Sequence, residues 1–362
     1  MGVDVTNDAG TSPLGEHPQR NEPPGRGSAG LILAVETSCD DTCAAVVTHD
    51  GEIRANVISS QGIHDRYGGV VPEVASRHHL ELATPVVDDA LARAGATLDD
   101  VDLVAVTAGP GLVGALLVGV ATAKGIAAAR GLPLAAVDHL QGHVAANFLR
   151  DPDGGAPLEP PFLCLVASGG HTFLARVDDH AGFTVLGATL DDAAGEAIDK
   201  GARLLGLPFP GGPHLERLAA GGDPAAFAFP VSKNVAGLDF SFAGLKTALL
   251  YKVRDLGEET AAERRADLAA AYQHAIVEQI ARRVERALEQ TGLDRLAIGG
   301  GVAANGPLRE RLSALAPTVK IPPRELCTDN AAMIASAARW VTPVAFPDYL
   351  GLEVHATGQR AL

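Results

Sequence analysis

The chain has 362 residues, enough for two domains once a flexible tail is set aside, and 47% of them are hydrophobic but only 4% aromatic. Its formal net charge of -15 at pH 7 excludes binding of nucleic acid through a uniform positive field, so a nucleic-acid substrate would need a local basic patch or partner proteins. The four cysteines lack zinc-knuckle or redox-pair spacing, no stretch of roughly 18 residues is uninterruptedly apolar, and the start lacks the order of a signal peptide. These features predict a reduced, cytoplasmic α/β enzyme that does not cross a membrane.

The predicted elements begin after an unstructured tail. Residues 1–30 are rich in Gly, Pro, Asn, Asp and Ser and cannot bury enough apolar surface to offset the entropy of ordering. From Leu31 onward two short apolar runs around a polar turn predict a β-hairpin, and a helix, a strand, a glycine turn and a long helix of small residues follow. Lys124 and the many small residues of the long helix predict a buried helix of a folded protein and not a membrane span. This order is typical of an α/β fold, and the predicted segments are 31–36, 43–47, 72–94, 102–107, 108–111 and 111–131.

The second half of the chain opens as the first half does. After a Pro/Gly-rich linker at 151–161, the apolar run FLCLVA is followed by the polar turn 168–172 and another short strand. Because both halves begin with strand, polar turn and strand, the sequence indicates an internal duplication. Helices near 193–205 and 261–290 and a strand at 296–300 complete the second half.

Two histidines, His139 and His143, carry the sharpest local signal. Residues i and i+4 of a helix lie on one face with Cβ atoms about 5 to 6 Å apart, so two imidazoles can share one cation, although two unrelated histidines on a helix explain the pair equally well. Asp329 is a candidate third ligand, and its place before the helical run from Ala331 also suits a plain N-cap. Two histidines and one carboxylate suit iron(II) and are acceptable to zinc, while Gln141 leaves no adjacent Glu of the kind that zinc proteases use.

Polar and glycine-rich turns give further candidate binding sites. The glycines after Ser168 let backbone N–H groups approach an anion, and an ordinary hairpin turn is the alternative. The cluster 299–305 joins a strand to a helix, where nucleotides often bind, but it is not a GxGxxG motif. Asp199, on a predicted helix, is able to bond a ribose hydroxyl or simply to face solvent. In the first polar turn, Asp40 and Asp41 are able to hold a metal, orient a water or accept a proton.

Ten motifs stand in order between Leu31 and about Ala337. They are ETSCDDT (36–42), YGGVVPEVASRHHLE (67–81), TAGPGLVGALLVG (107–119), DHLQGH (138–143), ASGGHT (167–172), DDAAGEAIDK (191–200), PGGP (210–213), DFSFAGLKTA (239–248), GGVAAN (300–305) and CTDNAAMIA (327–335). Together they resemble the TsaD (YgjD, Gcp) family of tRNA threonylcarbamoyladenosine transferases. The departures are small: Gln141 and Asp138 stand where relatives often show Glu and His, and neither change removes a ligand or a loop glycine.

The resemblance implies the fold and its division into parts. The expected fold is the duplicated two-lobe α/β fold of the actin, sugar kinase and Hsp70 group, with a nucleotide held in the cleft between the lobes. The first lobe is expected to comprise residues 31–150, completed by 322–345, and the second lobe residues 151–321. Residues 346–362 are expected to form a C-terminal tail.

The resemblance also implies site residues. The HxxxH pair and the aspartate of TDNxxMIA imply one metal ion, iron(II) by preference and zinc as the alternative, on His139, His143 and Asp329. We assign Asp40 as the proton acceptor. An adenylate substrate is expected to contact a further set of residues, namely Val166, Ala167, Ser168, Gly169, Gly170, Asp199, Gly212 and Asn305.

The implied reaction moves the threonylcarbamoyl group from threonylcarbamoyl-AMP to the exocyclic amine of adenosine at tRNA position 37, in tRNAs reading codons that begin with adenine, and releases AMP. The implied partners are tRNA, the proteins TsaB and TsaE, and TsaC as the supplier of the adenylate. Three rival interpretations stay open: a phosphotransferase of the same fold, a secreted metalloprotease, and a nonenzymatic nucleotide switch. Imidazole ligands disfavour the phosphotransferase, and the absence of a signal peptide, of a disulfide pattern and of an adjacent Glu disfavours the protease.

Overall fold

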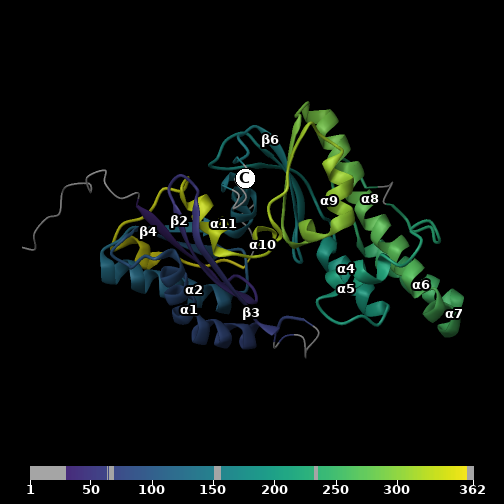
Figure 1. The fold of residues 1–362 in the computed structure, drawn as a ribbon, viewed down its shortest axis with the longest axis horizontal. Helices are drawn as coiled ribbons and strands as arrows, with labels where there is room; N and C mark the ends of the chain where they lie inside the picture. The colour runs from purple at the N-terminus through teal and green to yellow at the C-terminus, as the bar shows by residue number, and fades with distance from the viewer. Residues whose placement is uncertain (1–29, 63, 65–68, 151–155, 232–234, 357–362) are drawn as a thin grey trace, which may run out of the picture.

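The computed structural model describes residues 30–62, 64, 69–150, 156–231 and 235–356, which form two five-stranded sheets and the helices around them (Figure 1). The predicted N-terminal tail, apart from Gly30, lies outside the described residues. So do the first half of the predicted linker and the end of the predicted C-terminal tail.

The first sheet has the strand order β3-β2-β1-β4-β5. The predicted hairpin is confirmed, because β1 pairs with β2 antiparallel, while β4 and β5 extend the sheet in parallel with β1. Helix α1 (Pro72–Ala94) has the predicted bounds because proline begins its first turn and Gly95, in the left-handed conformation at φ 62°, ends it. The strands are β1 (Leu31–Glu36), β2 (Asp41–Thr48), β3 (Ile53–Ser60), β4 (Val101–Gly109) and β5 (Leu134–Asp138).

The second sheet repeats the first. Its strand order is β10-β9-β6-β7-β8. Read from β8 to β10, its strands correspond one by one to β3, β2, β1, β4 and β5 of the first sheet, with the same two antiparallel and two parallel pairings. The two halves therefore share one topology, and the predicted duplication is confirmed. The strands are β6 (Phe162–Ala167), β7 (Thr172–Val177), β8 (Thr184–Ala188), β9 (Arg295–Gly299) and β10 (Thr318–Lys320).

The alternation of side chains along the strands builds three cores. In β1, Leu33 and Val35 pack with α1 and α2 (Val113–Arg130), whereas Ile32 faces the middle of the molecule. In β6, Leu165 packs against the helices of the second half, and Val166 faces the same middle core. The middle core also holds α3 (His139–Ala145) and α11 (Ala331–Ala338), which therefore lie between the two sheets. The outer helices of the second half are α4 (Ala194–Leu204), α5 (Gly211–Ala219), α6 (Ala243–Leu256), α7 (Glu258–Glu263), α8 (Arg265–Thr291) and α9 (Gly306–Ser313).

The predicted helix at 261–290 is wrong in one respect, because the structure divides it into α7 and α8. Arg264 leaves helical geometry at φ -94° and ψ 15°, and its Nε donates to Asp267 in the first turn of α8. Short-range periodicity continues through this break, so it is invisible in the hydrophobic pattern.

Helix α2 is the one helix among the described residues that is long and apolar enough to span a membrane by length and composition. One of its faces buries Leu116, Val120 and Ala123 against β4 and α1. Lys124 donates to the backbone carbonyls of Leu350 and Leu352, each at 2.8 Å. Helix α2 therefore packs one face on the first lobe and leaves other residues, including Val113 and Leu117, exposed.

The described part of the C-terminal segment packs against the first sheet. Val344 pairs with Leu134 in an isolated antiparallel bridge, and Tyr349, in the short 3-10 helix η4 (Asp348–Gly351), is buried. The backbone N–H of His355 donates to the carbonyl of Ala108 at 3.0 Å. The segment thus ends beside the glycine turn that precedes α2.

Candidate functional site

Helix α3 carries the two histidines and begins directly at the end of β5. Asp138 caps it by accepting hydrogen bonds from the backbone N–H groups of Leu140 at 2.8 Å and Gln141 at 3.1 Å. This cap makes His139 the first helical residue, so His143 follows on the same face. Their ring centroids lie 4.7 Å apart in an edge-to-face arrangement.

Close packing of two helices brings the third candidate ligand to this face. A Cβ atom at Gly142 would lie 2.8 Å from Cδ1 of Ile334, so glycine lets α3 approach α11 closely. Asp329 precedes α11, and its Oδ1 lies 3.5 Å from Nε2 of His139 and 3.3 Å from Nε2 of His143. The structure therefore brings together His143 and Asp329, which are 186 positions apart in sequence.

The suggestion that Asp329 is a helix N-cap is wrong. Asn330 caps α11, because its side-chain oxygen accepts from the backbone N–H of Met333 at 2.9 Å. Both residue types are good caps, so the sequence could not choose between them. With the cap made by its neighbour, the carboxylate of Asp329 is free to face the histidines.

The three side chains fit one divalent metal ion. Their candidate ligand atoms all lie within 4.8 Å of one another. His143 is completely buried, and neither of its ring nitrogens has a hydrogen-bond partner in the described structure. A buried imidazole whose nitrogens make no hydrogen bond is unfavourable, and a metal between Nε2 and the nearby carboxylate of Asp329 would satisfy that nitrogen. Two imidazoles and one carboxylate suit iron(II) or zinc.

Glu36, which sequence reasoning missed, orients the ring of the candidate ligand His139. Its Oε2 lies 3.0 Å from Nδ1 of His139 and accepts from Thr107, while its Oε1 accepts from the backbone N–H of Ser38. Burial opposes ionisation of Glu36, but the charge and hydrogen bond of His139 hold its pKa below the usual range. A carboxylate at Nδ1 places the proton there and leaves the Nε2 lone pair for a metal.

A cavity of about 640 Å³ adjoins the metal-ligand triad, and we call it the glycine-lined cavity. Thr328, which lines it, is the neighbour of Asp329 in sequence. Four of the residues expected to contact an adenylate line this cavity, and they come from four separate motifs: Gly169, Asp199, Gly212 and Asn305. The side chain of Arg324 is exposed and forms no ion pair within the described residues, so it adds positive charge to the lining.

Asp199 and Asn305 also stabilise the helices around the cavity through hydrogen bonds. Asp199 on α4 accepts from the backbone N–H of Gly211 at 2.7 Å and so holds the start of α5, and burial raises its pKa above the usual range. Asn305 caps α9 by accepting from Leu308, and its amide nitrogen donates to Glu216 and Gln273, both at 3.1 Å. Asn305 thus lines the cavity with both amide atoms already engaged.

The turn between β6 and β7 contributes Gly169 to the lining of the glycine-lined cavity. Ser168 is buried, and its hydroxyl oxygen accepts from the backbone N–H of His171 at 3.1 Å. Val166 and Ala167 bury their side chains in the cores on either side of β6, and Gly170 is exposed outside the cavity lining. Only the backbone of this strand end is therefore available to a ligand.

His171 connects this turn to the triad. Burial and the nearby imidazoles of His139 and His143 lower its pKa to about 4. His171 is consequently neutral at pH 7. Sequence reasoning noticed the glycines of this turn and passed over the histidine.

The turn between β1 and β2 is clamped by a histidine of the first lobe. His79 on α1 is buried, with Nδ1 2.8 Å from the hydroxyl of Thr42 and Nε2 3.0 Å from the carbonyl of Cys39. Asp40 is partly exposed in this turn and does not belong to the triad. Burial raises the pKa of the adjacent Asp41 to about 7.

The model of one protein family matches residues 52–336, and its description is TsaD, tRNA N6-adenosine threonylcarbamoyltransferase. The chain belongs to this family. The match covers most of the chain and includes the triad, the glycine-lined cavity and its walls.

Curated TsaD relatives extend the likeness over nearly their full length. The tRNA N6-adenosine threonylcarbamoyltransferase of Symbiobacterium thermophilum is 51% identical over 319 residues, covering 87% of this chain and 92% of its own. The enzyme of the same name from Moorella thermoacetica is 53% identical over 318 residues, covering 85% and 90%. At this identity a secreted metalloprotease and a phosphotransferase are both disfavoured as the main activity.

Solved structures with other names and about 15% identity share the fold of this TsaD chain. The HypF protein of T. kodakarensis aligns with a TM-score of 0.56 at 15% identity, over 86% of this chain and 47% of its own. Component A of (R)-2-hydroxyglutaryl-CoA dehydratase from Acidaminococcus fermentans aligns with a TM-score of 0.51 at 15% identity, over 86% and 97%. These likenesses and the two equivalent sheets confirm the predicted two-lobe fold of the actin, sugar kinase and Hsp70 group.

Proposed function

We propose that this tRNA N6-adenosine threonylcarbamoyltransferase takes its acyl group from threonylcarbamoyl-AMP, modifies adenosine 37 of tRNAs that read codons beginning with adenine, and releases AMP. One observation carries the proposal: Thr328 lines the glycine-lined cavity, and the next residue, Asp329, faces both histidines. An adenylate in the cavity would therefore place its reactive end beside the triad.

The chemistry is an acyl transfer between two bound substrates. The exocyclic nitrogen of adenosine forms a bond to the carbamoyl carbon, the bond between that carbon and the phosphate oxygen breaks, and AMP leaves. The amine loses a proton, and Asp40 is the proposed acceptor. Because the amine is a poor nucleophile, the enzyme must hold both reactants in place and stabilise charge on the carbonyl oxygen and the leaving phosphate.

The residues of the cavity divide the work of holding the adenylate. In the proposed binding mode, the backbone at Gly169 and the charge of Arg324 bind the phosphate, and Asp199 binds the ribose hydroxyls; all three residues line the cavity. Asn305 shapes the wall through its bonds to Glu216 and Gln273. The rest of the Ser168 turn contributes backbone rather than side chains.

The triad is proposed to hold one divalent ion, iron(II) by preference and zinc as the alternative. Such an ion would supply electrostatic stabilisation to oxygens of the threonylcarbamoyl-adenylate. The protein's own part is to fix the ligands: Asp138 starts α3, Gly142 seats it on α11, and Glu36 orients His139.

Partner proteins are proposed because the chain is acidic and its substrate is a polyanion. The chain has a formal net charge of -15, so it needs partner proteins to bind the polyanionic tRNA. We assign this role to TsaB and TsaE, with TsaC as the source of the adenylate. Leu80 on α1 and Val113 and Leu117 on α2 are exposed large apolar residues on adjacent helices, which suits a protein contact. A cytoplasmic location is proposed with these partners.

Nucleoside analysis of tRNA tests the function. Cells depleted of this protein should lose the threonylcarbamoyl modification, and an unchanged nucleoside profile would refute the proposal. In vitro, the purified chain with synthetic threonylcarbamoyl-AMP and a tRNA transcript should turn over slowly alone and efficiently with TsaB and TsaE. Robust turnover by the isolated chain would contradict the assignment of partners.

Two variants separate the roles at the site. His143→Ala should abolish transfer and lower the metal content measured by mass spectrometry, whereas the exposed His49→Ala serves as a histidine control. Asp40→Asn should lower transfer and leave the metal content unchanged. Full transfer by Asp40→Asn would remove the base assignment without touching the metal assignment.

A further inference from the structure

The turn that follows β1 carries Asp40, and hydrogen bonds hold the backbone on both sides of this residue. The carbonyl of Cys39, in the peptide group before the Cα atom of Asp40, lies 3.0 Å from Nε2 of His79. The carbonyl of Asp40, in the peptide group after that Cα atom, accepts from the backbone N–H of Gln61 at 3.2 Å. Because both flanking peptide planes are held, the direction in which the Asp40 side chain leaves the backbone is held as well.

The contacts of His79 define its tautomer. A carbonyl oxygen can only accept, so Nε2 carries the proton and donates to Cys39. Nδ1 then accepts from the hydroxyl of Thr42 at 2.8 Å. His79 is completely buried, and burial lowers its pKa, so the ring is neutral at pH 7. Both nitrogens of this ring are therefore bound to the turn.

Gln61 is itself held by its neighbours. Its side-chain nitrogen donates to the carbonyl of Ala75 on α1 at 3.3 Å, and its Oε1 lies 3.0 Å from Nε2 of His64. Nδ1 of His64 accepts from the backbone N–H of Val71 at 3.3 Å, which leaves the ring proton on Nε2 for Gln61. Helix α1 thus holds the turn by two routes, directly through His79 and indirectly through Gln61.

The turn held in this way lies beside the metal-ligand triad. Ser38, two residues before Asp40, brings its hydroxyl within 3.2 Å of Nδ1 of His139. Burial raises the pKa of the Cys39 thiol, and the nearby charges of Asp40 and Asp329 raise it further. One residue of the turn therefore lies close to both carboxylates.

We propose that His79 is a positioning residue for the transfer reaction: by holding the carbonyl of Cys39 and the hydroxyl of Thr42, it fixes the direction of the Asp40 carboxylate beside the triad. This inference rests on the proposed role of Asp40 as the proton acceptor. His79 does not line the glycine-lined cavity, so its loss should misplace a reacting group and leave adenylate binding intact.

Two amide variants separate the two nitrogens of His79. The amide of glutamine reaches the position of Nε2 and can still donate to Cys39, whereas the amide of asparagine reaches only the position of Nδ1. In the transfer assay with TsaB and TsaE, His79→Asn should lower kcat about 10- to 100-fold and change the KM for threonylcarbamoyl-AMP less than about twofold. His79→Gln should recover most of the lost kcat. Equal kcat values for the two variants, or a loss confined to KM, would overturn the proposal.

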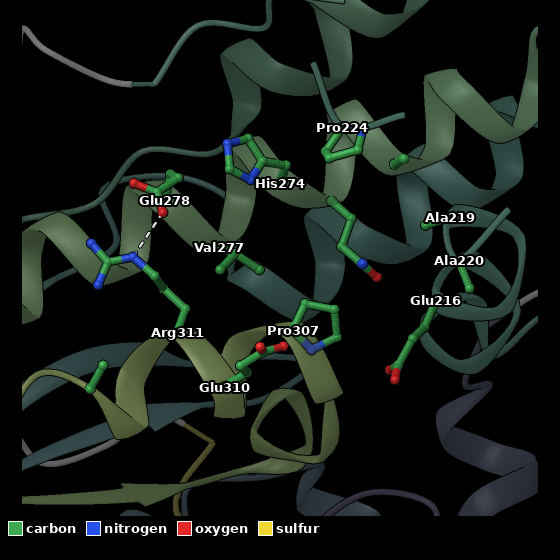
Figure 2. A pocket seen from close by; sticks show the side chains of 13 residues that line it. Glu216, Ala219, Ala220, Pro224, His274, Val277, Glu278, Pro307, Glu310 and Arg311 are labelled. Atoms are coloured by element: carbon green, nitrogen blue, oxygen red, sulfur yellow. Dashed lines mark hydrogen bonds and ion pairs between the residues drawn. The ribbon is translucent and has the colours of Figure 1, made fainter. Parts of the chain in front are cut away.

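Two other helical histidines serve as matched controls. His78 precedes His79 on α1, is partly exposed and makes no hydrogen bond within the described residues. His274, labelled in Figure 2, is an exposed histidine of α8 that lines a cavity among α5, α8 and α9 in the second lobe. His78→Asn and His274→Asn should keep the kcat of the wild type. If either control lost as much kcat as His79→Asn, no specific role would remain for His79.

Hydrogen–deuterium exchange tests the positioning without use of the reaction. The Asp40 carbonyl protects the backbone amide of Gln61, so exchange of this amide should become about tenfold faster in His79→Asn and change little in His79→Gln. Unchanged exchange in a folded His79→Asn protein would contradict the proposal. If this variant does not fold, Thr42→Val, which removes the donor to Nδ1, takes its place in both measurements.

A double variant tests whether His79 acts through Asp40. When His79→Asn is added to Asp40→Asn, kcat should fall no further, because the group that His79 positions is already gone. Losses that multiply would rule out the proposed route. Full transfer by Asp40→Asn alone would instead refute the proposed acceptor and with it the link to the reaction, whereas the exchange of the Gln61 amide decides independently whether His79 holds the turn.

Discussion

Replacing Glu36 by glutamine changes one oxygen of a buried carboxylate to an amide nitrogen and leaves the side-chain volume almost unchanged. The carboxylate accepts three hydrogen bonds, from the backbone N–H of Ser38, the hydroxyl of Thr107 and Nδ1 of His139. A glutamine has one acceptor end, so it cannot serve all three donors. The variant therefore isolates the orientation of His139 from packing.

Either orientation of the new amide is unfavourable. If its oxygen faces His139 and Thr107, its nitrogen meets the N–H of Ser38, and two donors oppose each other in the core. If its nitrogen faces His139, Nδ1 must accept, the ring proton moves to Nε2, and the metal-facing lone pair is lost. Loss of such an outer-shell carboxylate weakens metal binding about 10- to 100-fold, or about 1.4 to 2.7 kcal/mol.

The assay is competition for iron(II) or zinc between the protein and a chelator of known affinity. Glu36→Gln should release metal at a chelator concentration about 10- to 100-fold lower than the wild type does. Glu52→Gln is the matched control, because Glu52 has an exposed ion pair with Arg54 at 3.5 Å and lies outside the triad. Unchanged metal affinity in a folded Glu36→Gln protein would refute the role given to this carboxylate.

Three further predictions test the site and its surroundings. Burial lowers the pKa of His139, but Asp329 and Glu36 raise it to about 9, so metal binding should release a proton and tighten about tenfold per pH unit from pH 6 to 8, as chelator competition would show. Burial raises the pKa of Asp41 to about 7, so between about pH 4 and pH 7 the folded protein holds a proton that the unfolded chain has lost, and the free energy of unfolding should fall as the pH rises through this window. In urea unfolding, Asp41→Asn should have a free energy of unfolding about 2 to 4 kcal/mol higher than the wild type at pH 8, and nearly the same as the wild type at pH 4. Gly142→Ala should destabilise the protein by about 1 to 3 kcal/mol and lower metal affinity, whereas Gly125→Ala, with open space around its Cβ, should stabilise α2 by up to about 1 kcal/mol in the same assay.

Local signals account for much of what the sequence predicted. The bounds of α1 follow from Pro72 and Gly95, whose backbone preferences begin and end a helix wherever it packs. The pairing of His139 with His143 follows from helix geometry alone. Asp329 was only one candidate third ligand, with a plain N-cap as the alternative, until the resemblance to a family joined it to the pair, because no spacing rule connects residues so distant in sequence.

The residues that escaped prediction are defined by neighbours in space. Glu36 is the last residue of a buried strand and has no helical or turn signature; its role follows from Thr107 and His139, which only the folded sheet places beside it. Glu216 resembles any charged residue on an amphipathic helix until Asn305 is seen to donate to it. Such carboxylates become informative only when burial and hydrogen-bond partners are known.

The duplicated topology suits the proposed binding of two unlike substrates beside the triad. The turn after β1 and the turn after β6 hold equivalent places in their sheets, and both approach α3, which packs between the sheets. The first turn brings the hydroxyl of Ser38 within 3.2 Å of His139 and presents Asp40, whereas the second brings Gly169 to the glycine-lined cavity and His171 near the triad. A carboxylate that accepts a proton would repel a phosphate. With Asp40 on one turn and the proposed phosphate-binding backbone on the other, the two negative charges stay apart. On the proposed mechanism, changes in the first turn should therefore act mainly on kcat and changes in the second mainly on the affinity for AMP.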